Sequence, residues 1–289
     1  ILIDRDLGES FRFGRPVIDI IVERLPVTVE LALAAMIFAT ILGIIFGVIS
    51  AYWHNSGVDI ATMVGANIGI SVPVFVLGLL LQYVFALLFK DTFLQLPPSG
   101  RLTSGITNPP FFEVWGLNID PKTSLYTTLA FFANLNILNA LVTANWEAFG
   151  DALKHMLLPA VAVGTIPLAI IARITRASLL EVLNLDYIRT ARAKGLAEMG
   201  VVFQHGLSNA LLPVVTIVGL QLGYLLAGAV LTETIFNLAG LGRTLFEAIT
   251  ARDYVIVQGF TLIIAVGYVF INLIVDISYA FLDPRIRLS

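Results

Sequence analysis

The chain has 289 residues, of which 58% are hydrophobic and only 13% are charged, and its mean hydropathy is +0.91. Soluble domains carry about 25% charged residues, so this composition argues against a soluble protein. The net charge of −3 does not suggest nucleic-acid binding, and the absence of cysteine excludes disulfides and thiolate chemistry.

Five apolar stretches predict helices that span a membrane. A bilayer core requires about 20 apolar residues in a helix, and Glu30 and Asp276 are the only acidic residues, with no Lys or Arg, within these stretches, each near one end. Residues 1–25 are too rich in charge to span and form an extracytoplasmic lead-in. The predicted spans are 26–51, 60–89, 155–172, 206–232 and 254–282.

A sixth apolar stretch, 123–146, contains Asn134, Asn136, Asn139 and Asn145. Unpaired amides facing lipid are costly, so we expect short helices lying on the surface rather than a span. The alternative, a true span, stays open at this point, and it would invert the side of everything before it. With the surface reading, 91–150 is one extramembrane insert.

Basic residues near span ends predict the orientation. The loop 173–205 carries five of them, and the tail 283–289 carries Arg285 and Arg287. Two spans separate these segments, so both are expected on the cytoplasmic side. The lead-in, the insert 91–150 and the segment 233–253 then face outward.

Within the loop 173–205, the sequence DYIRTARAKGLAEMG (186–200) predicts a docking helix over 186–199, with Asp186 as its N-cap. At 100° per residue, one narrow face contains Tyr187, Ile188, Ala191, Gly195 and Met199, with the basic side chains flanking it. A glycine inside a helix costs about 1 kcal/mol relative to alanine, and a lipid-facing helix gains nothing from it. This favours protein docking over the alternative, a basic helix that binds anionic headgroups.

Four motifs that follow one another along the chain resemble those of a known family. They are DYIRTARAKGL, NALLPVVTIVGLQLG, GAVLTETIFNLAGLGRTLFEAITARDY and NLIVDISYAFLDPRIR. Together they resemble the permease subunit of a peptide-type (dipeptide/oligopeptide) ABC importer with the type I importer fold. The general signature of such permeases, Glu-Ala-Ala-x3-Gly, is matched here only at Ala191 and Gly195. The Leu-Pro pair that ends the signature is displaced here to Pro213. Both variations resemble the peptide-type branch of the family.

The resemblance implies an all-α, multi-pass helical bundle that forms half of a translocation pathway in a bacterial or archaeal cell (inner) membrane. It implies a second permease subunit as heterodimer partner, two ATP-binding subunits that hold the ATP and Mg²⁺, and an extracytoplasmic solute-binding protein. This chain itself is expected to bind no cofactor. The family usually has one more span upstream, and because the chain starts at Ile1, we expect that first span to be missing. The ATPase-coupling residues implied by the resemblance are Tyr187, Ile188, Arg189, Thr190, Ala191, Arg192, Ala193, Lys194, Gly195 and Leu196.

Polar side chains inside the predicted spans are candidates either for interhelical hydrogen bonds or for the pathway. They are Asn67, Ser71, Gln82, Thr216, Gln221, Gln258 and Asn272. The segment 234–253 is too apolar for a solvated loop, so a re-entrant hairpin or a surface helix is expected there, with a loop packed on its neighbours as the alternative. Candidates for an outer gate or receptor contact in this segment are Phe236, Leu241, Arg243 and Phe246.

Several rival functions are weakened by what the sequence lacks. No Gly-rich loop followed by Lys-Ser/Thr is present, so an ATPase site of that kind is not expected in this chain. The scattered His54, His155 and His205 form no metal-ligand spacing. A secondary transporter would need ionisable groups at mid-membrane, whereas Glu30 and Asp276 lie near span ends. A structural membrane protein with a lipid-binding basic loop remains the alternative.

Overall fold

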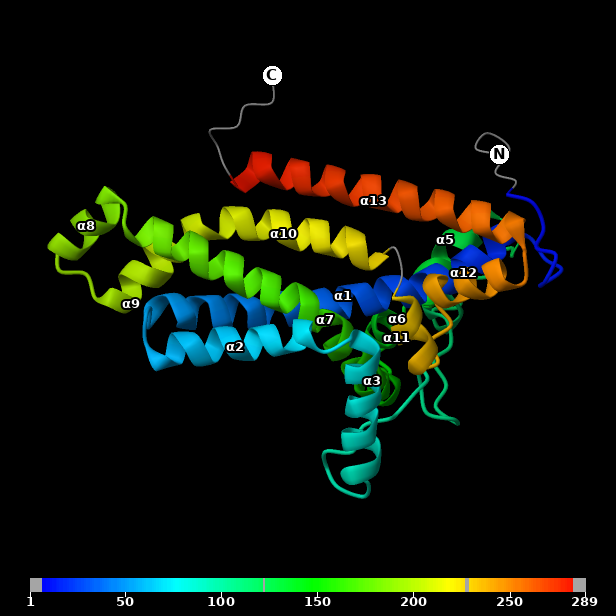
Figure 1. The fold of residues 1–289 in the computed structure, drawn as a ribbon. Coiled ribbons are helices and arrows are strands. Elements are labelled where there is room, and N and C mark those ends of the chain that lie inside the picture. The colour runs from blue at the N-terminus through cyan, green and yellow to red at the C-terminus, as the bar shows by residue number, and fades with distance from the viewer. Residues whose placement is uncertain (1–6, 122, 227–228, 283–289) are drawn as a thin grey trace. The chain divides into compact units, whose positions relative to one another are not determined.

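The computed structural model describes residues 7–121, 123–226 and 229–282, without the side chains of residues 276 and 278–282. The tail arginines and Asp276, on which sequence expectations rested, therefore lie outside the described residues or side chains. The regular secondary structure of the described chain is all helical, and its only β pairing is an isolated bridge between Glu9 and Pro16 (Figure 1).

The helices of the first half of the chain are α1 (Val17–Tyr52), α2 (Gly57–Ser71), α3 (Val74–Gln82), the π-helix η1 (Tyr83–Leu88), α4 (Phe111–Val114), α5 (Ser124–Ala133) and α6 (Asn136–Val142). Those of the second half are α7 (Trp146–Leu183), α8 (Asp186–Ala193), α9 (Glu198–Gly200), the π-helix η2 (Val201–Leu207), α10 (Ser208–Leu226), α11 (Val230–Ile235), α12 (Leu241–Thr250) and α13 (Tyr254–Leu282).

The chain divides into two compact units, each assembled from segments that are distant in sequence. Unit 1 comprises Ile1–Ala34, Val74–Ala162 and Tyr224–Tyr268. Unit 2 comprises Ala35–Pro73, Val163–Gly223 and Val269–Ser289.

Among the described residues, four helical stretches are long and apolar enough to cross a membrane. The number rises to six if each of two bent helix pairs is counted as one span. The four are Val17–Tyr52, Trp146–Leu183, Glu198–Leu226 and Tyr254–Val275. At 1.5 Å per residue the 38 residues of α7 extend for about 57 Å, well beyond a hydrocarbon core of about 30 Å. The apolar stretch 155–172 is therefore only its middle part. The chain is accordingly an all-α, multi-pass membrane protein.

Two predicted spans are not single continuous helices. The stretch 60–89 is broken at Val72–Pro73, where Val72 adopts an extended conformation with φ −96° and ψ 127°. A residue before proline is disfavoured in the helical region, which explains the break. The stretch 206–232 is divided between α10 and α11, with residues 227–228 outside the description.

The asparagine-rich stretch 123–146 forms two short helices in unit 1, α5 and α6, which meet at an angle of 95°. They contain 10 and 7 residues, so neither alone reaches the length of a span. Asn139 is fully buried, and it donates to Asn108 and Pro109 and accepts from the Phe111 N–H. The amides of Asn139 and Asn145 thus find partners within the insert, and that of Asn134 donates to the Val22 carbonyl of α1.

Glu30, the acid near one end of the first predicted span, also has a partner from the insert. Its carboxylate accepts from Arg101 Nη2 at 2.7 Å and from the Ile137 N–H at 2.6 Å, and its side chain is buried. Arg101 further donates to the Asn134 carbonyl at 2.6 Å. A buried charge must be paired. The hydrogen bonds of Glu30 to Arg101 and Ile137 therefore hold the insert against α1 within unit 1.

Candidate functional site

The basic loop of unit 2 folds as a helical hairpin in which α8 leads through residues 194–197 into α9 and η2. Figure 1 shows α8 and α9 beyond the ends of α7 and α10, at the same end as the turn between α1 and α2. The predicted helix over 186–199 is therefore wrong in its extent, because α8 ends at Ala193.

Gly195 ends the helix rather than lying inside it. Its φ of +78° is in the left-handed region, and its N–H donates to the Arg192 carbonyl at 2.9 Å while the Leu196 N–H donates to the Ala191 carbonyl. This pair of bonds is a Schellman motif, in which glycine is preferred because it has no Cβ. The cost of a glycine within a helix therefore gives no support for docking. A glycine directly after a periodic stretch is itself a sequence signal of a helix end.

The face of α8 that is buried and the face that is exposed also differ from the prediction made from the sequence. Ile188 is fully buried and Ala191 is 8% exposed, and both pack on Val201 and Leu183 of the same chain. The centre of the predicted docking face is therefore turned inward, whereas Tyr187 and Met199 of the same predicted face are exposed. The opposite face is solvent-exposed and carries Asp186, Arg189, Thr190 and Ala193.

The exposed face of α8 is short, polar and small. Asp186 is the first helical residue and Leu185 is the N-cap, so the predicted capping role of Asp186 is not observed. Its carboxylate lies 3.3 Å from Arg189 Nη1, with both side chains largely exposed. Lys194 and Leu196 follow on the surface immediately after the helix. Small and charged groups of this kind suit close approach of another protein, with charges at the rim.

Tyr187 joins the beginning of α8 to the base of α10. Its hydroxyl donates to the His205 carbonyl at 3.3 Å and accepts from Asn209 Nδ2 at 2.8 Å. Asn209 Nδ2 also lies 3.1 Å from the same carbonyl. Tyr187 was expected on a partner-facing surface, but its polar atom is engaged within the hairpin.

Arg192 joins the end of α8 to two other elements. Its Nε and Nη2 donate to the two carboxylate oxygens of Glu198 at 3.1 and 2.7 Å, and its Nη1 donates to the Leu183 carbonyl at 3.4 Å. The hydrogen bonds that Arg192 donates to Glu198 raise the pKa of the guanidinium above its ordinary value. Glu198 could not be predicted as the partner of Arg192 from the sequence, because a loop separates the two residues and helix periodicity carries no signal for the pair.

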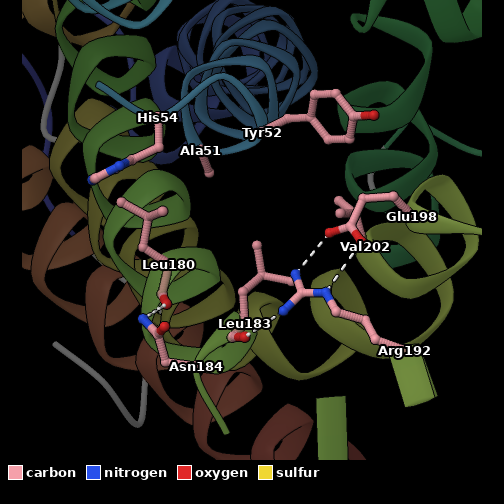
Figure 2. Close-up of a pocket in the computed structure, with 9 residues that line it drawn as sticks. All are labelled: Ala51, Tyr52, His54, Leu180, Leu183, Asn184, Arg192, Glu198 and Val202. Atoms are coloured by element: carbon pink, nitrogen blue, oxygen red, sulfur yellow. Dashed lines mark hydrogen bonds and ion pairs between the residues drawn. The ribbon is translucent and has the colours of Figure 1, made fainter. Parts of the chain in front are cut away.

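A pocket of about 520 Å³ lies beside this hairpin within unit 2. Figure 2 shows Arg192, Glu198 and Val202 along one part of its wall and Tyr52 and His54, from the end of α1 and the following turn, along another. The remaining lining comes from Leu180 and Leu183 at the end of α7, from Asn184 directly after it, and from Ala51 of α1.

Replacement of Gly195 should weaken the end of α8. A residue with a Cβ atom costs about 1–2 kcal/mol when its backbone adopts the left-handed conformation, although asparagine adopts this conformation more readily than most. We expect Gly195→Leu to accelerate hydrogen exchange of the last α8 amides roughly tenfold, and Gly195→Asn to do so less. Equal exchange in all three proteins would contradict the capping role.

The polar residues of the predicted spans differ in their partners. Asn67, Ser71 and Thr216 each donate to a carbonyl four residues earlier in their own helix. Gln82 links separate elements, because it donates to the carbonyls of Pro98 and Ile235 within unit 1. Two residues, Gln221 and Asn272, are half-buried, whereas Gln258 is exposed on α13. Whether any of them touches a substrate stays a prediction.

The outer segment of unit 1 forms α11 and α12, of which α12 packs on α1 and α13. Phe236 and Leu241 are buried, so in this conformation neither is available to a receptor. Phe246 is 57% exposed, and Arg243 is half-buried with hydrogen bonds to Asn237 and Glu247. Of the predicted contact residues, Phe246 is the one that presents an open surface.

A buried carboxylate holds this outer segment together. Glu233 accepts from Thr28 Oγ1 at 2.7 Å and from the Arg243 N–H at 2.8 Å, and Thr28 Oγ1 accepts from the Leu241 N–H at 2.8 Å. Burial raises the pKa of Glu233, against the hydrogen bonds that lower it. These contacts satisfy free N–H groups in the first turn of α12, which fixes α12 to α1 and α11.

Comparisons with known proteins agree with this architecture. The family described as "Binding-protein-dependent transport system inner membrane component" matches residues 43–288. The chain is 43% identical to "Dipeptide transport system permease protein DppB" of Alkalihalophilus pseudofirmus, over 98% of this chain and 77% of the relative. It is also 43% identical to "Di/tripeptide transport system permease protein DppB" of Pseudomonas aeruginosa, over 98% and 76%, and to the dipeptide permease of Escherichia coli K12, over 98% and 77%.

Proposed function

Since the chain belongs to the family of binding-protein-dependent transport system inner membrane components, we propose that it is a permease subunit of an ATP-driven importer for di- or oligopeptides. The observation that carries the substrate class is the identity of 43% to dipeptide and di/tripeptide permeases over nearly the whole chain. The multi-pass helical fold suits a membrane pathway, and the chain is a transport component rather than the site of ATP hydrolysis.

We further propose that energy enters through the hairpin at 186–199. Its exposed face, formed by Asp186, Arg189, Thr190 and Ala193, would dock on an ATPase subunit that binds ATP and Mg²⁺. The supporting observation is that this face has no partner within the described hairpin apart from the Asp186–Arg189 contact and the bond from Thr190 Oγ1 to the Asp186 carbonyl. In this orientation, the loop 173–205 and the C-terminus are cytoplasmic.

The proposed assembly contains a second permease, two ATPase subunits and an extracytoplasmic solute-binding protein. Affinity purification of this chain from cells that express all the subunits should recover both permeases and the ATPases together, and the reconstituted complex should take up dialanine with ATP. A complex with this chain as its only permease that transports dialanine at the same rate would contradict the heterodimer.

The insert 91–150 is proposed to lie outside the cytoplasm. Asn118 is exposed in the insert, and the chain has no native cysteine. We therefore expect Asn118→Cys to react with an impermeant thiol reagent on intact spheroplasts. Lys194→Cys, exposed in the hairpin, is the matched control and should react only after lysis. The reverse pattern would overturn the proposed topology.

A further inference from the structure

Tyr187 and Arg192 of the hairpin form hydrogen bonds within this chain, although the sequence placed both among the docking residues. We infer that Tyr187 and Arg192 are positioning residues that transmit movement of α8 to α10 and α7, and that they do not contact the ATPase. This inference rests on the proposed docking of α8, and it assigns separate roles to the exposed and the fastened residues of the same short helix.

The end of α8 is fastened to α7 through Arg192. The guanidinium uses both of its outer nitrogens and Nε: two donate to Glu198 and one donates to the carbonyl of Leu183, the last residue of α7. The last carbonyls of a helix lack partners within it, so this bond joins α8 directly to the end of α7. The planar, five-donor guanidinium is suited to such a forked arrangement, whereas a lysine ammonium is not.

The beginning of α8 is fastened to the other flanking helix through Tyr187. Its hydroxyl lies between the His205 carbonyl in η2 and the Asn209 amide in the first turn of α10. Between the two ends, the buried contact of Ile188 and Ala191 with Val201 prevents α8 from sliding along η2. The helix is therefore held at both ends and along its inner face.

The side-chain hydrogen bonds of α8 run to α7, η2 and α10. The pocket of about 520 Å³ separates part of the hairpin from the turn that follows α1, where Tyr52 and His54 form the facing wall (Figure 2). Among the residues that line this pocket, the hydrogen bonds of Arg192 run to Glu198 and Leu183 and not to the α1 side. These hydrogen bonds thus pass a displacement of α8 to α7 and α10, while the contact with the end of α1 is the apolar packing of Val202 of η2 on Val48 and Ala51.

The test uses the complete complex, with this chain, its partner permease, the ATPase subunits and the solute-binding protein, in proteoliposomes. The measured quantities are the recovery of ATPase subunits with the purified chain and the number of dialanine molecules taken up per ATP hydrolysed. The variants are Arg192→Glu, Glu198→Arg, the double charge swap and Tyr187→Phe, at matched abundance. Arg192→Lys and Glu198→Gln serve if a charge reversal lowers abundance.

We expect each charge reversal to lower dialanine uptake per ATP at least fivefold, while ATPase recovery stays within twofold of the native complex. The charge swap should restore at least half of the native ratio, and Tyr187→Phe should lower it at least twofold. An unchanged ratio in the single variants would overturn the inference, as would loss of ATPase recovery in parallel with the ratio or failure of the swap to restore it. Failure of the native complex to bind ATPase subunits would instead refute the proposed function.

Discussion

Ala193→Trp should weaken the association of the chain with its ATPase subunits by about 10- to 100-fold while leaving the permease folded. Ala193 lies on the exposed face of α8, opposite the buried Ile188 and Ala191. An indole there meets no atom of the hairpin core but would overfill a docked interface. Overpacking of a fitted contact costs about 1–3 kcal/mol, and each 1.4 kcal/mol is a factor of ten in affinity. We therefore expect ATPase recovery and dipeptide uptake to fall about 10- to 100-fold, with Thr190→Trp acting in the same direction.

The matched control for this prediction is Ala191→Trp, the same substitution on the buried face of the same helix. It should displace α8 from Val201 and Leu183 and lower the folded amount of protein, which is a different outcome from loss of binding alone. Abundance is measured by gel filtration in detergent, and association by co-purification. Normal ATPase recovery from both Ala193→Trp and Thr190→Trp would mean that this face does not dock, and headgroup binding would then be preferred.

Arg176→Met should destabilise unit 2 more than any other single substitution considered. Arg176 Nε and Nη2 donate to the two carboxylate oxygens of Asp59 at 2.8 and 2.7 Å, and this carboxylate also accepts from Ser50 and the Asn55 N–H. The Asp59 side chain is only 6% exposed, against 28% for Arg176. Removal of one partner of a buried pair costs about 3–5 kcal/mol, a large part of a total stability of about 5–15 kcal/mol.

The two halves of this pair should not be equivalent. Asp59→Leu leaves a guanidinium that can reach water, so we expect it to cost less than Arg176→Met, which strands a buried carboxylate. The double variant should cost less than the sum of the two, because it leaves no unpaired charge. Thermal unfolding in detergent measures all three. Equal, additive losses would show that the pair is not coupled.

Much of the helical architecture could be predicted from hydropathy alone. The prediction 254–282 coincides with α13, and 26–51 lies within α1. An apolar stretch of this length has few folded alternatives in a membrane, because every backbone group must be hydrogen-bonded within the segment. The family was likewise predictable, since four separate motifs occur in order along the chain and the comparisons confirm it.

The docking face of α8 could not be predicted in this way. Periodicity identifies residues that share a face, here Ile188 with Ala191, but it does not say what covers that face. In the folded protein Val201 covers it, because the backbone at Gly195 adopts a positive φ and lets the chain turn back. From the sequence alone, the small residues of α8 were explained by docking of a partner. In the structure, Ala191 instead packs inside the hairpin.

Pairs of polar residues distant in sequence were also decided by the tertiary structure. By itself the sequence determined the fold class, the apolar stretches, the basic loop and the family. Only folding brought Arg101 to Glu30, Arg176 to Asp59 and Thr28 to Glu233. A buried charge or amide is stable only with a partner. The sequence shows that such a partner is required but does not identify it, because the partner lies on another helix or loop and only packing brings the two together.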